Sequence, residues 1–341
     1  MKPLLTFVFV LAVTLSPGSV FAEDTPANAL LVLSKHDQTL AIVDPSSLKV
    51  IARIPVGNDP HEVIASSDGK IAYVSNYGSG AFHTLAVVDL IAQKALPAID
   101  LGALRGPHGL AFVEGKVWFT AEAAKAIGSY DSEKKDVDWI LGIGQNRTHM
   151  IYVSPDLRLI VTTNVSSGTV SIIERTASGG PSQGGPMATP RTDWNETVVR
   201  VGNGSEGFDI SPDGKEIWVA NAGDGTVSII DVASKQVTQT LAADVRSANR
   251  LKFTPDGKFV LISALRGADV TVIEAATRKT TKRIAVGHGS AGIVMQPDGA
   301  RAYIACTPDD YVAVIDLQSM KVVGHIQAGS NPDGLAWMIR H

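Results

Sequence analysis

Three histidines stand at one repeating position of this 341-residue sequence. His61 and His149 each precede the aspartate of a Ser-Asp or Pro-Asp turn by seven residues, and His108 holds the same position before a turn that is one residue shorter. Imidazole is the commonest metal ligand in proteins, and it titrates near neutral pH. Three imidazoles that converge could bind Zn²⁺ or Cu²⁺ and leave one coordination position open. The spacing therefore predicts a candidate metal site formed by His61, His108 and His149.

Other polar residues occur at or near this position in the remaining repeats. A carboxylate there could orient a metal-bound histidine or act as a general base, and arginines would suit an anionic ligand. Two alternatives stay open: the histidines are ordinary polar lining that bonds backbone carbonyls or waters, or a His/Glu pair works without a metal. The candidate ligand-binding set comprises His61, His108, His149, Glu206, Asn249, Arg105 and Arg147.

The elements that must position these residues come from a sequence that repeats seven times. A five-residue β-rich phrase with an acidic last residue recurs at intervals of 42 to 45 residues, apart from one interval of 57. Three further β-rich runs, separated by Gly or Asp-Gly turns, follow each copy, and short runs of this kind are typical of antiparallel strands. Four strands in a period of about 40–45 residues is the pattern of a propeller blade. The copies are Leu40–Asp44, Leu85–Asp89, Ile127–Asp131, Val170–Glu174, Val227–Asp231, Val270–Glu274 and Val312–Asp316.

The two ends of the chain complete one another. The run Gly334–Ile339 ends the last repeat, and the strand which that repeat lacks is Ala29–Ser34, just before the first copy. One blade is thus expected to combine three N-terminal strands with one C-terminal strand, so that no sheet edge stays open at the seam. The fold class expected is all-β, a single seven-bladed β-propeller over residues 23–341.

The acidic residue that ends each phrase is expected to be structural. A catalytic acid would not be needed seven times, whereas a carboxylate at the end of a strand commonly accepts backbone N–H groups of the turn that follows.

Several of these phrases resemble a known repeat. Ile71–Asn76, Glu216–Asn221, Ser211–Gly214 and Val227–Asp231 are similar to the YVTN repeat of YncE-like seven-bladed propellers, and the resemblance covers residues 28–341. It implies the propeller fold. It does not select one activity, because similar propellers include lactonases, a streptogramin lyase and the propellers of copper and haem reductases, and one fold hosts many functions. The chain has no C-x-x-C-H motif, so covalent haem is not expected.

The amino-acid composition excludes several classes of protein. Hydrophobic residues make up 45% of the chain, which excludes intrinsic disorder. The formal net charge of −4 argues against a nucleic-acid binder, which usually carries a basic face. The single cysteine, Cys306, excludes a disulfide framework and any multi-cysteine metal site.

Two segments fall outside the repeats. Residues 1–22 combine Lys2, the apolar run Leu4–Leu15 and a small-residue cleavage site ending at Ala22, which predicts a secretory signal peptide and a periplasmic or secreted protein. No later run is apolar for long enough to cross a bilayer. The interval of 57 residues contains a Gly/Pro-rich stretch, so residues 175–196 are expected to form a flexible insertion.

These observations favour an exported binding or scaffolding propeller. It would present its His-rich channel face to a small ligand, a partner protein or one divalent Zn or Cu ion. The alternative is a metal-assisted lyase or lactone hydrolase that uses the same face, in which the three histidines bind the ion. Bound metal with an open position would favour the enzyme, and a metal-free channel would favour the binding protein.

Overall fold

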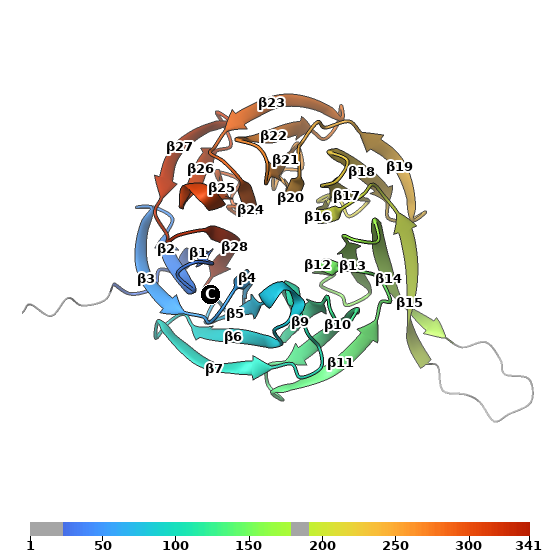
Figure 1. Cartoon of the computed structure of the whole chain (residues 1–341), viewed down its shortest axis with the longest axis horizontal. Helices are drawn as coiled ribbons and strands as arrows, with labels where there is room; N and C mark the ends of the chain where they lie inside the picture. The colour runs from blue at the N-terminus through green and yellow to red at the C-terminus, as the bar shows by residue number, and fades with distance from the viewer. Residues whose placement is uncertain (1–22, 179–190) are drawn as a thin grey trace, which may run out of the picture.

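The computed structural model describes residues 23–178 and 191–341, and it folds them into seven four-stranded antiparallel sheets arranged as a ring (Figure 1). The predicted seven-bladed β-propeller is therefore confirmed. Blade 1 joins β28 (Pro332–Ile339) to β1 (Asn28–Ser34), β2 (Thr39–Asp44) and β3 (Lys49–Pro55), as the sharing of one blade between the two chain ends required. The predicted signal peptide, residues 1–22, lies outside the described residues.

The other six blades follow in chain order, each with its innermost strand first. Blades 2 and 3 contain β4 (Pro60–Ala65), β5 (Ile71–Asn76), β6 (Thr84–Asp89), β7 (Lys94–Asp100), β8 (Pro107–Val113), β9 (Lys116–Ala121), β10 (Ala126–Asp131) and β11 (Asp136–Gly142). Blades 4 and 5 contain β12 (Thr148–Val153), β13 (Leu159–Asn164), β14 (Thr169–Ser178), β15 (Arg191–Arg200), β16 (Ser205–Ile210), β17 (Glu216–Asn221), β18 (Thr226–Asp231) and β19 (Gln236–Leu241). Blades 6 and 7 contain β20 (Ala248–Phe253), β21 (Phe259–Ala264), β22 (Asp269–Glu274), β23 (Lys279–Ala285), β24 (Ser290–Met295), β25 (Arg301–Cys306), β26 (Tyr311–Asp316) and β27 (Lys321–Ile326).

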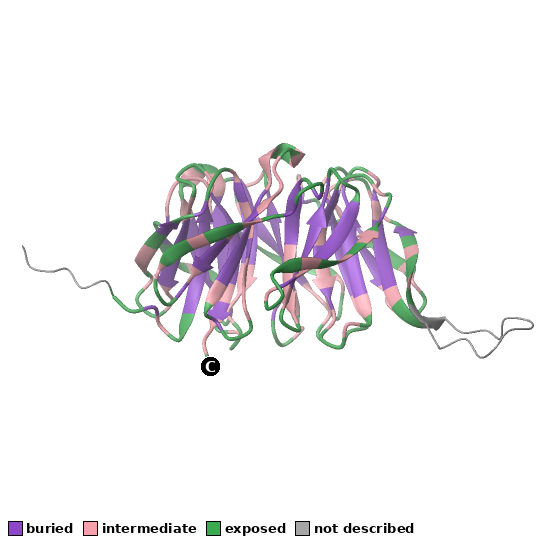
Figure 2. Cartoon of the chain, turned by 90° about the horizontal axis from the view of Figure 1, so that it is seen from below, coloured by how far each residue is buried: buried purple, intermediate pink, exposed green. Residues whose placement is uncertain are grey.

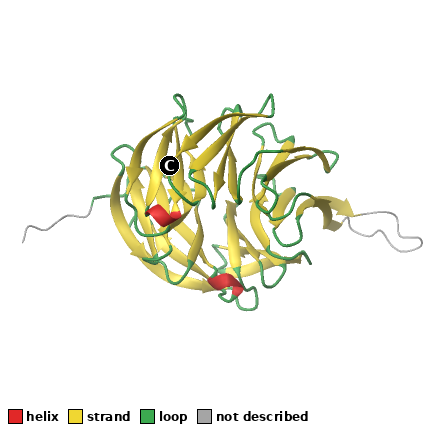
Figure 3. Ribbon diagram, turned by 45° about the horizontal axis from the view of Figure 1, so that its top comes forward, coloured by secondary structure: helices red, strands yellow, loops and turns green. Residues whose placement is uncertain are grey.

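Helical structure is limited to two short 3₁₀ turns in the described part of the chain, η1 (Gly78–Gly80) and η2 (Thr307–Asp309), drawn in red in Figure 3. No helix among the described residues is long and apolar enough to cross a membrane.

Each blade is stabilised by the blade beside it. The described residues form seven apolar clusters, and each cluster takes its side chains from two neighbouring blades. The third strand of a blade, such as β2, is therefore buried at all but its two end residues, while an outer strand such as β11 alternates between exposed and half-buried residues. Figure 2 shows this contrast between purple inner strands and green and pink outer strands. This difference explains why the repeated phrase is almost continuously apolar: both of its faces pack against other blades.

The expected flexible insertion, residues 175–196, is corrected at both of its ends. The ladder between β14 and β15 continues from Thr169↔Arg200 to Ser178↔Arg191, so residues 175–178 and 191–196 are paired strand residues and do not form a loop. Trp194 also packs on Trp139 of blade 3, with ring centroids 5.4 Å apart. The backbone hydrogen bonds and this aromatic contact order a segment whose composition indicated a linker. The remaining residues, 179–190, lie outside the described part.

The acidic residues of the repeated phrase accept backbone N–H groups of their own turns, as expected, in five of the seven copies. Asp44 accepts the N–H of Ser46, and Asp89, Asp131, Asp231 and Asp316 make equivalent bonds. The two glutamates differ: Glu274 accepts the Thr277 hydroxyl, and Glu174 pairs with Lys235. Their longer side chains reach past the backbone of the turn.

Aspartates in the turns between the first two strands of a blade predict acid sensitivity. The hydroxyl of Thr254, followed by Lys258, lowers the pKa of Asp256 from 3.8 to about 2. A carboxyl group whose pKa is lowered by folding stabilises the protein at pH values above the pKa of the unfolded state. This stabilisation is lost as the pH falls toward the pKa of the folded state. Asp256→Asn is therefore expected to lower the urea midpoint at neutral pH, and the difference from wild type should shrink between pH 3.8 and about 2. Urea titrations at a series of pH values measure this; a constant difference would contradict it.

Candidate functional site

The second residue of every innermost strand lies at one mouth of the central channel. In chain order from β4 these residues are His61, His108, His149, Glu206, Asn249, Ala291 and Asp333. All seven line a single cavity of about 350 Å³, together with Lys35, Arg147 and Arg250. The structure thus brings together six of the seven candidate residues. Arg105 is the exception: it is exposed in the loop before β8, and its side chain is not one of the described groups that line this cavity.

A β-bulge in each blade directs these side chains toward the channel. The pairing of β4 with β5 shifts register between Pro60 and Val63, so His61 falls outside the regular ladder, and the other blades repeat this shift. A bulge leaves residues unpaired and redirects their side chains. Hydroxyl groups of the neighbouring blade satisfy the freed carbonyls: Ser75 donates to the carbonyl of His108 at 2.9 Å and Thr120 to that of His149 at 2.8 Å.

The innermost strands approach one another so closely that glycine follows the ring residue in four blades. A Cβ atom at Gly109 would lie 2.5 Å from the carbonyl oxygen of His149, and one at Gly334 would lie 2.4 Å from that of His61. Only glycine fits such an approach without moving the backbone. This packing holds the ring residues side by side around the channel.

His149 is clamped between two carboxylates. Its Nδ1 lies 2.6 Å from Oε1 of Glu122, and its Nε2 lies 2.8 Å from Oε2 of Glu206. Burial alone would lower the pKa of His149, but the charge of Glu206 and the two hydrogen bonds outweigh it, so the pKa is raised above 6.5. Burial would likewise raise the pKa of Glu206, yet His149, Arg250 and Arg147 lower it to about 2. With both nitrogens donating, His149 is an imidazolium in this arrangement, and it would have to release one of these protons to bind a metal ion.

Glu122 and Tyr77 belong to the site although they were not predicted. Oε2 of Glu122 accepts the Tyr77 hydroxyl at 2.5 Å, and burial together with this contact raises the pKa of Tyr77 to about 12. Both residues directly follow the second strand of their blades, as Lys35 does in blade 1. Comparing this position across the repeats would have found them, because the corresponding residues in blades 4 to 6 are Val165, Ala222 and Leu265.

His108 differs from its neighbours in having no polar partner. It is 1% exposed, and neither ring nitrogen has a hydrogen-bond partner in the part of the chain that the structure describes. Its ring stacks near His149, with centroids 3.7 Å apart, and meets the ring of Tyr77 edge-on at 5.1 Å. Burial, followed by the positive charge of His149, holds the pKa of His108 well below 6.5. The ring of His108 is therefore neutral, and one of its two nitrogens offers a lone pair within the site.

His61 interacts with charged groups on its own side of the channel mouth. Nζ of Lys35 lies 2.9 Å from Nδ1 of His61, and the same amine is 3.2 Å from Asp333 and 3.5 Å from Asp59. The hydrogen bond with His61 is the main cause that lowers the pKa of Asp59. His61 remains within reach of His108, with ring centroids 4.6 Å apart.

Arg250, which lines the cavity, forms an ion pair that crosses the channel. Arg250 of β20 contacts Glu62 of β4, which belongs to a blade that is not its neighbour. Both side chains are largely buried, at 9% and 13% exposure. Burial would lower the pKa of Arg250, but Glu62, Asp333 and Glu206 raise it. The pair thus links blades 2 and 6 across the ring.

Three buried side chains among the described residues come together closely enough to hold one metal ion. One donor atom each from His108, Glu122 and His149 lies within 4.8 Å of the other two. Two imidazoles and a carboxylate are ligands that Zn²⁺ accepts. The predicted trio was His61, His108 and His149; the group that converges here contains Glu122 in place of His61.

Comparisons with known proteins agree on the fold. A protein of unknown function from Desulfotomaculum acetoxidans superposes with a TM-score of 0.72 over 92% of this chain and 100% of its own, at 15% identity. A Bacteroides uniformis protein provisionally named a 6-phosphogluconolactonase gives 0.70 over 92% and 100%, at 14% identity. Hydrazine synthase from Kuenenia stuttgartiensis gives 0.65 over 81% and 88%, at 18% identity. No protein-family model matches the sequence, and neither does any curated protein.

The fold and the site together define a class. The chain is a seven-bladed β-propeller whose channel mouth carries three histidines within a network of buried charges. At identities this low, the neighbours establish the fold alone, and the resemblance to YVTN repeats stays a prediction.

Proposed function

We propose that this protein is an exported, YVTN-type binding propeller that holds one divalent transition-metal ion, Zn²⁺ or Cu²⁺, at the mouth of its channel. The signal-like segment 1–22 supports export to the periplasm or beyond. The observation that carries the proposal is His108, a fully buried imidazole with two unpartnered nitrogens. Buried polar groups without a partner are rare and costly, and they are commonly explained by a ligand.

The surroundings of His108 support a metal ligand set. His149 and Glu122 supply the other two donors, and Glu206 bonds the far nitrogen of His149 at 2.8 Å. Ligating histidines almost always donate their second N–H to such a carboxylate, which fixes the orientation of the ring. The cavity of about 350 Å³ above the group leaves the fourth position open to water or to a small ligand.

Metal content is the direct test. The protein should be purified without an affinity tag, loaded with Zn²⁺ or Cu²⁺, desalted and measured by mass spectrometry of its metals. We expect close to one ion per chain, and its loss in the triple variant His61→Ala, His108→Ala, His149→Ala. The matched control is His83→Ala, which removes a partly exposed histidine that pairs with Asp100. Wild type that binds neither metal after loading would overturn the proposal.

One observation favours a second function for the same site, a metal-assisted lactone hydrolase or lyase. The cavity has room for a small organic molecule beside the metal group, and Arg147 at its rim would suit a phosphate or carboxylate. A bound ion would polarise the carbonyl of such a substrate. Hydrolysis of δ-gluconolactone and its 6-phosphate by metal-loaded protein, lost on His108→Leu, would establish this function; hydrolysis at the background rate would exclude lactones as substrates.

A further inference from the structure

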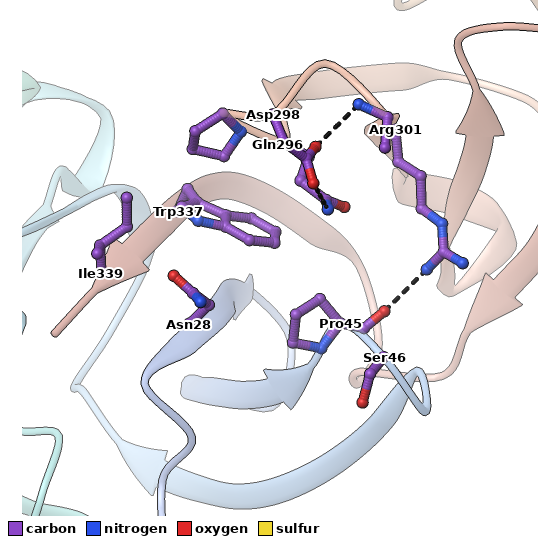
Figure 4. Close-up of a pocket in the computed structure, with 10 residues that line it drawn as sticks. Asn28, Pro45, Ser46, Gln296, Asp298, Arg301, Trp337 and Ile339 are labelled. Carbon is purple, nitrogen blue, oxygen red and sulfur yellow. Dashed lines mark hydrogen bonds between the residues drawn. The ribbon is translucent and has the colours of Figure 1, made fainter.

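A second cavity opens on the face opposite the histidines, at the seam where the two ends of the chain meet. Its volume is about 430 Å³, and it lies between blades 1 and 7 (Figure 4). Trp337 of β28 and Asn28 of β1 form one side, the turn around Ser46 forms the base, and Gln296, Asp298 and Arg301 of blade 7 form the other side. Trp337 stands four residues beyond Asp333 on the same strand, so the cavity lies at the far end of β28 from the channel mouth.

The way the ring closes makes this corner different from the corners of the other blades. In the other six blades a tight turn, such as residues 66–70 in blade 2, joins the innermost strand to the next. In blade 1, Leu30 of β1 pairs with Trp337 of β28, but the two strands come from opposite ends of the chain and no turn connects them. At the corner where the other blades have a turn, the two strands run on past Trp337, with Met338 paired to Ala29 and Ile339 to Asn28, and the cavity opens beside this ladder.

The residue at this corner also differs from its counterparts. Pairing with the second strand places Ala65, Phe112, Val153, Ile210, Phe253 and Met295 at the equivalent position of the other blades. Only Trp337 combines an aromatic face with an N–H donor. The repeats therefore serve as an internal control: the propeller does not need tryptophan here, and only the blade whose corner lacks a turn has it.

The ring of Trp337 packs against a buried aromatic side chain. It is tilted by 31° relative to the ring of Tyr303, with centroids 5.8 Å apart, and Tyr303 is fully buried. The Tyr303 hydroxyl is 3.0 Å from Oε1 of Gln296, which anchors the opposite wall of the cavity. Trp337 itself is half-buried, so its ring meets both the core and the cavity.

Polar groups around this face have hydrogen-bonding capacity to spare. Within the described residues, neither the side-chain amide of Asn28 nor the indole N–H of Trp337 makes a hydrogen bond. Arg301 donates from one Nη atom to the carbonyl of Pro45 at 2.8 Å, and the Asp298 carboxylate accepts from Gln296 at 2.8 Å. One guanidinium and one carboxylate leave the lining with no net charge. The cavity thus presents a flat apolar face ringed by amide, carboxylate and guanidinium groups.

We propose that this seam cavity binds a neutral sugar. The C–H face of a pyranose ring fits the negative π-face of an aromatic side chain, and its vicinal hydroxyls match amide, carboxylate and guanidinium groups, which offer paired donors and acceptors. A neutral lining disfavours ionic ligands, because an uncompensated charge would lose its hydration. The volume lies in the range of about 300–1,000 Å³ usual for small-molecule sites. The site is separate from the channel and does not depend on the function proposed for it.

Saturation-transfer NMR tests this proposal with the full chain. The probes are D-glucose, N-acetylglucosamine and cellobiose, with glucose 6-phosphate as the charged comparison. We expect transfer to at least one neutral sugar and weaker transfer to the phosphate. Asn28→Ala and Trp337→Phe should each weaken binding roughly five- to tenfold, the loss expected for one hydrogen bond.

Two features keep the test decisive. Asn28 is exposed, so its replacement leaves the fold intact even if changes at Trp337 disturb Tyr303. Trp194→Leu in blade 4 is the matched control for loss of a partly exposed tryptophan and should leave binding unchanged. Absence of transfer to all three neutral sugars, at concentrations that would fill a site of millimolar affinity, would overturn the proposal. So would binding that survives both seam variants.

Discussion

Replacing His108 with leucine is expected to stabilise the metal-free protein by about 1–2 kcal/mol while lowering its affinity for Zn²⁺ at least about 100-fold. The stabilisation follows because His108 is buried with both ring nitrogens unpartnered. A buried polar group without a partner costs about 1–3 kcal/mol, and an apolar side chain of similar volume removes that cost. Stability and ligand binding thus oppose one another at this position, as is common at functional sites.

Two measurements check this expectation, with His61 as the comparison. Urea unfolding in the presence of a chelator gives the change in stability, and competition with a chromophoric chelator gives the affinity for Zn²⁺. His61→Leu should cause a smaller loss of affinity, because His61 is held by Lys35 and lies outside the group of three converging donors. A destabilised His108→Leu protein would mean that His108 is satisfied by ordered water. Equal losses of affinity for the two variants would restore His61 to the ligand set.

The architecture and the ring of channel residues could be predicted because the sequence contains seven copies of one blade that can be compared with one another. Seven copies of one blade reveal which positions the fold requires and which positions vary. Counting back from the turns placed His61, His149 and Glu206 on the channel, and the bulge that each blade repeats puts them there. A position that every blade builds in the same way can be found by counting alone.

The rest of the site escaped prediction because it depends on contacts between blades. Glu122 lies beyond the end of β9, and it becomes part of the site only because His149 of the next blade and Tyr77 of the preceding blade reach it. Arg105 is only three residues from His108 in the sequence, yet it lies in a loop that leaves it exposed to solvent. The prediction of a flexible insertion was wrong at its ends for a related reason. Trp194 packs against Trp139 of another blade, and the local composition of residues 175–196 does not indicate that contact.

The ion pair across the channel carries the other large expected effect. Glu62→Gln is expected to destabilise the protein by about 3 kcal/mol, because it leaves the Arg250 guanidinium buried without its main partner. The double variant Glu62→Leu, Arg250→Met should recover most of this loss, since two apolar side chains of similar volume need no partner. The free energy of unfolding of wild type, of the single variants Glu62→Leu and Arg250→Met and of the double variant then gives a coupling energy, expected at about 2–4 kcal/mol.

A matched surface pair separates the effect of burial from that of charge. Lys70 and Asp68 also form an ion pair, at 3.1 Å, but their side chains are 59% and 53% exposed. The same cycle on this pair should give less than about 1 kcal/mol, because water already solvates both groups. A coupling for Glu62 and Arg250 as small as that of the surface pair would mean that the cross-channel contact does not hold the ring together. A large coupling would instead show that blades 2 and 6 stabilise one another through the channel, beyond the apolar contacts between neighbours.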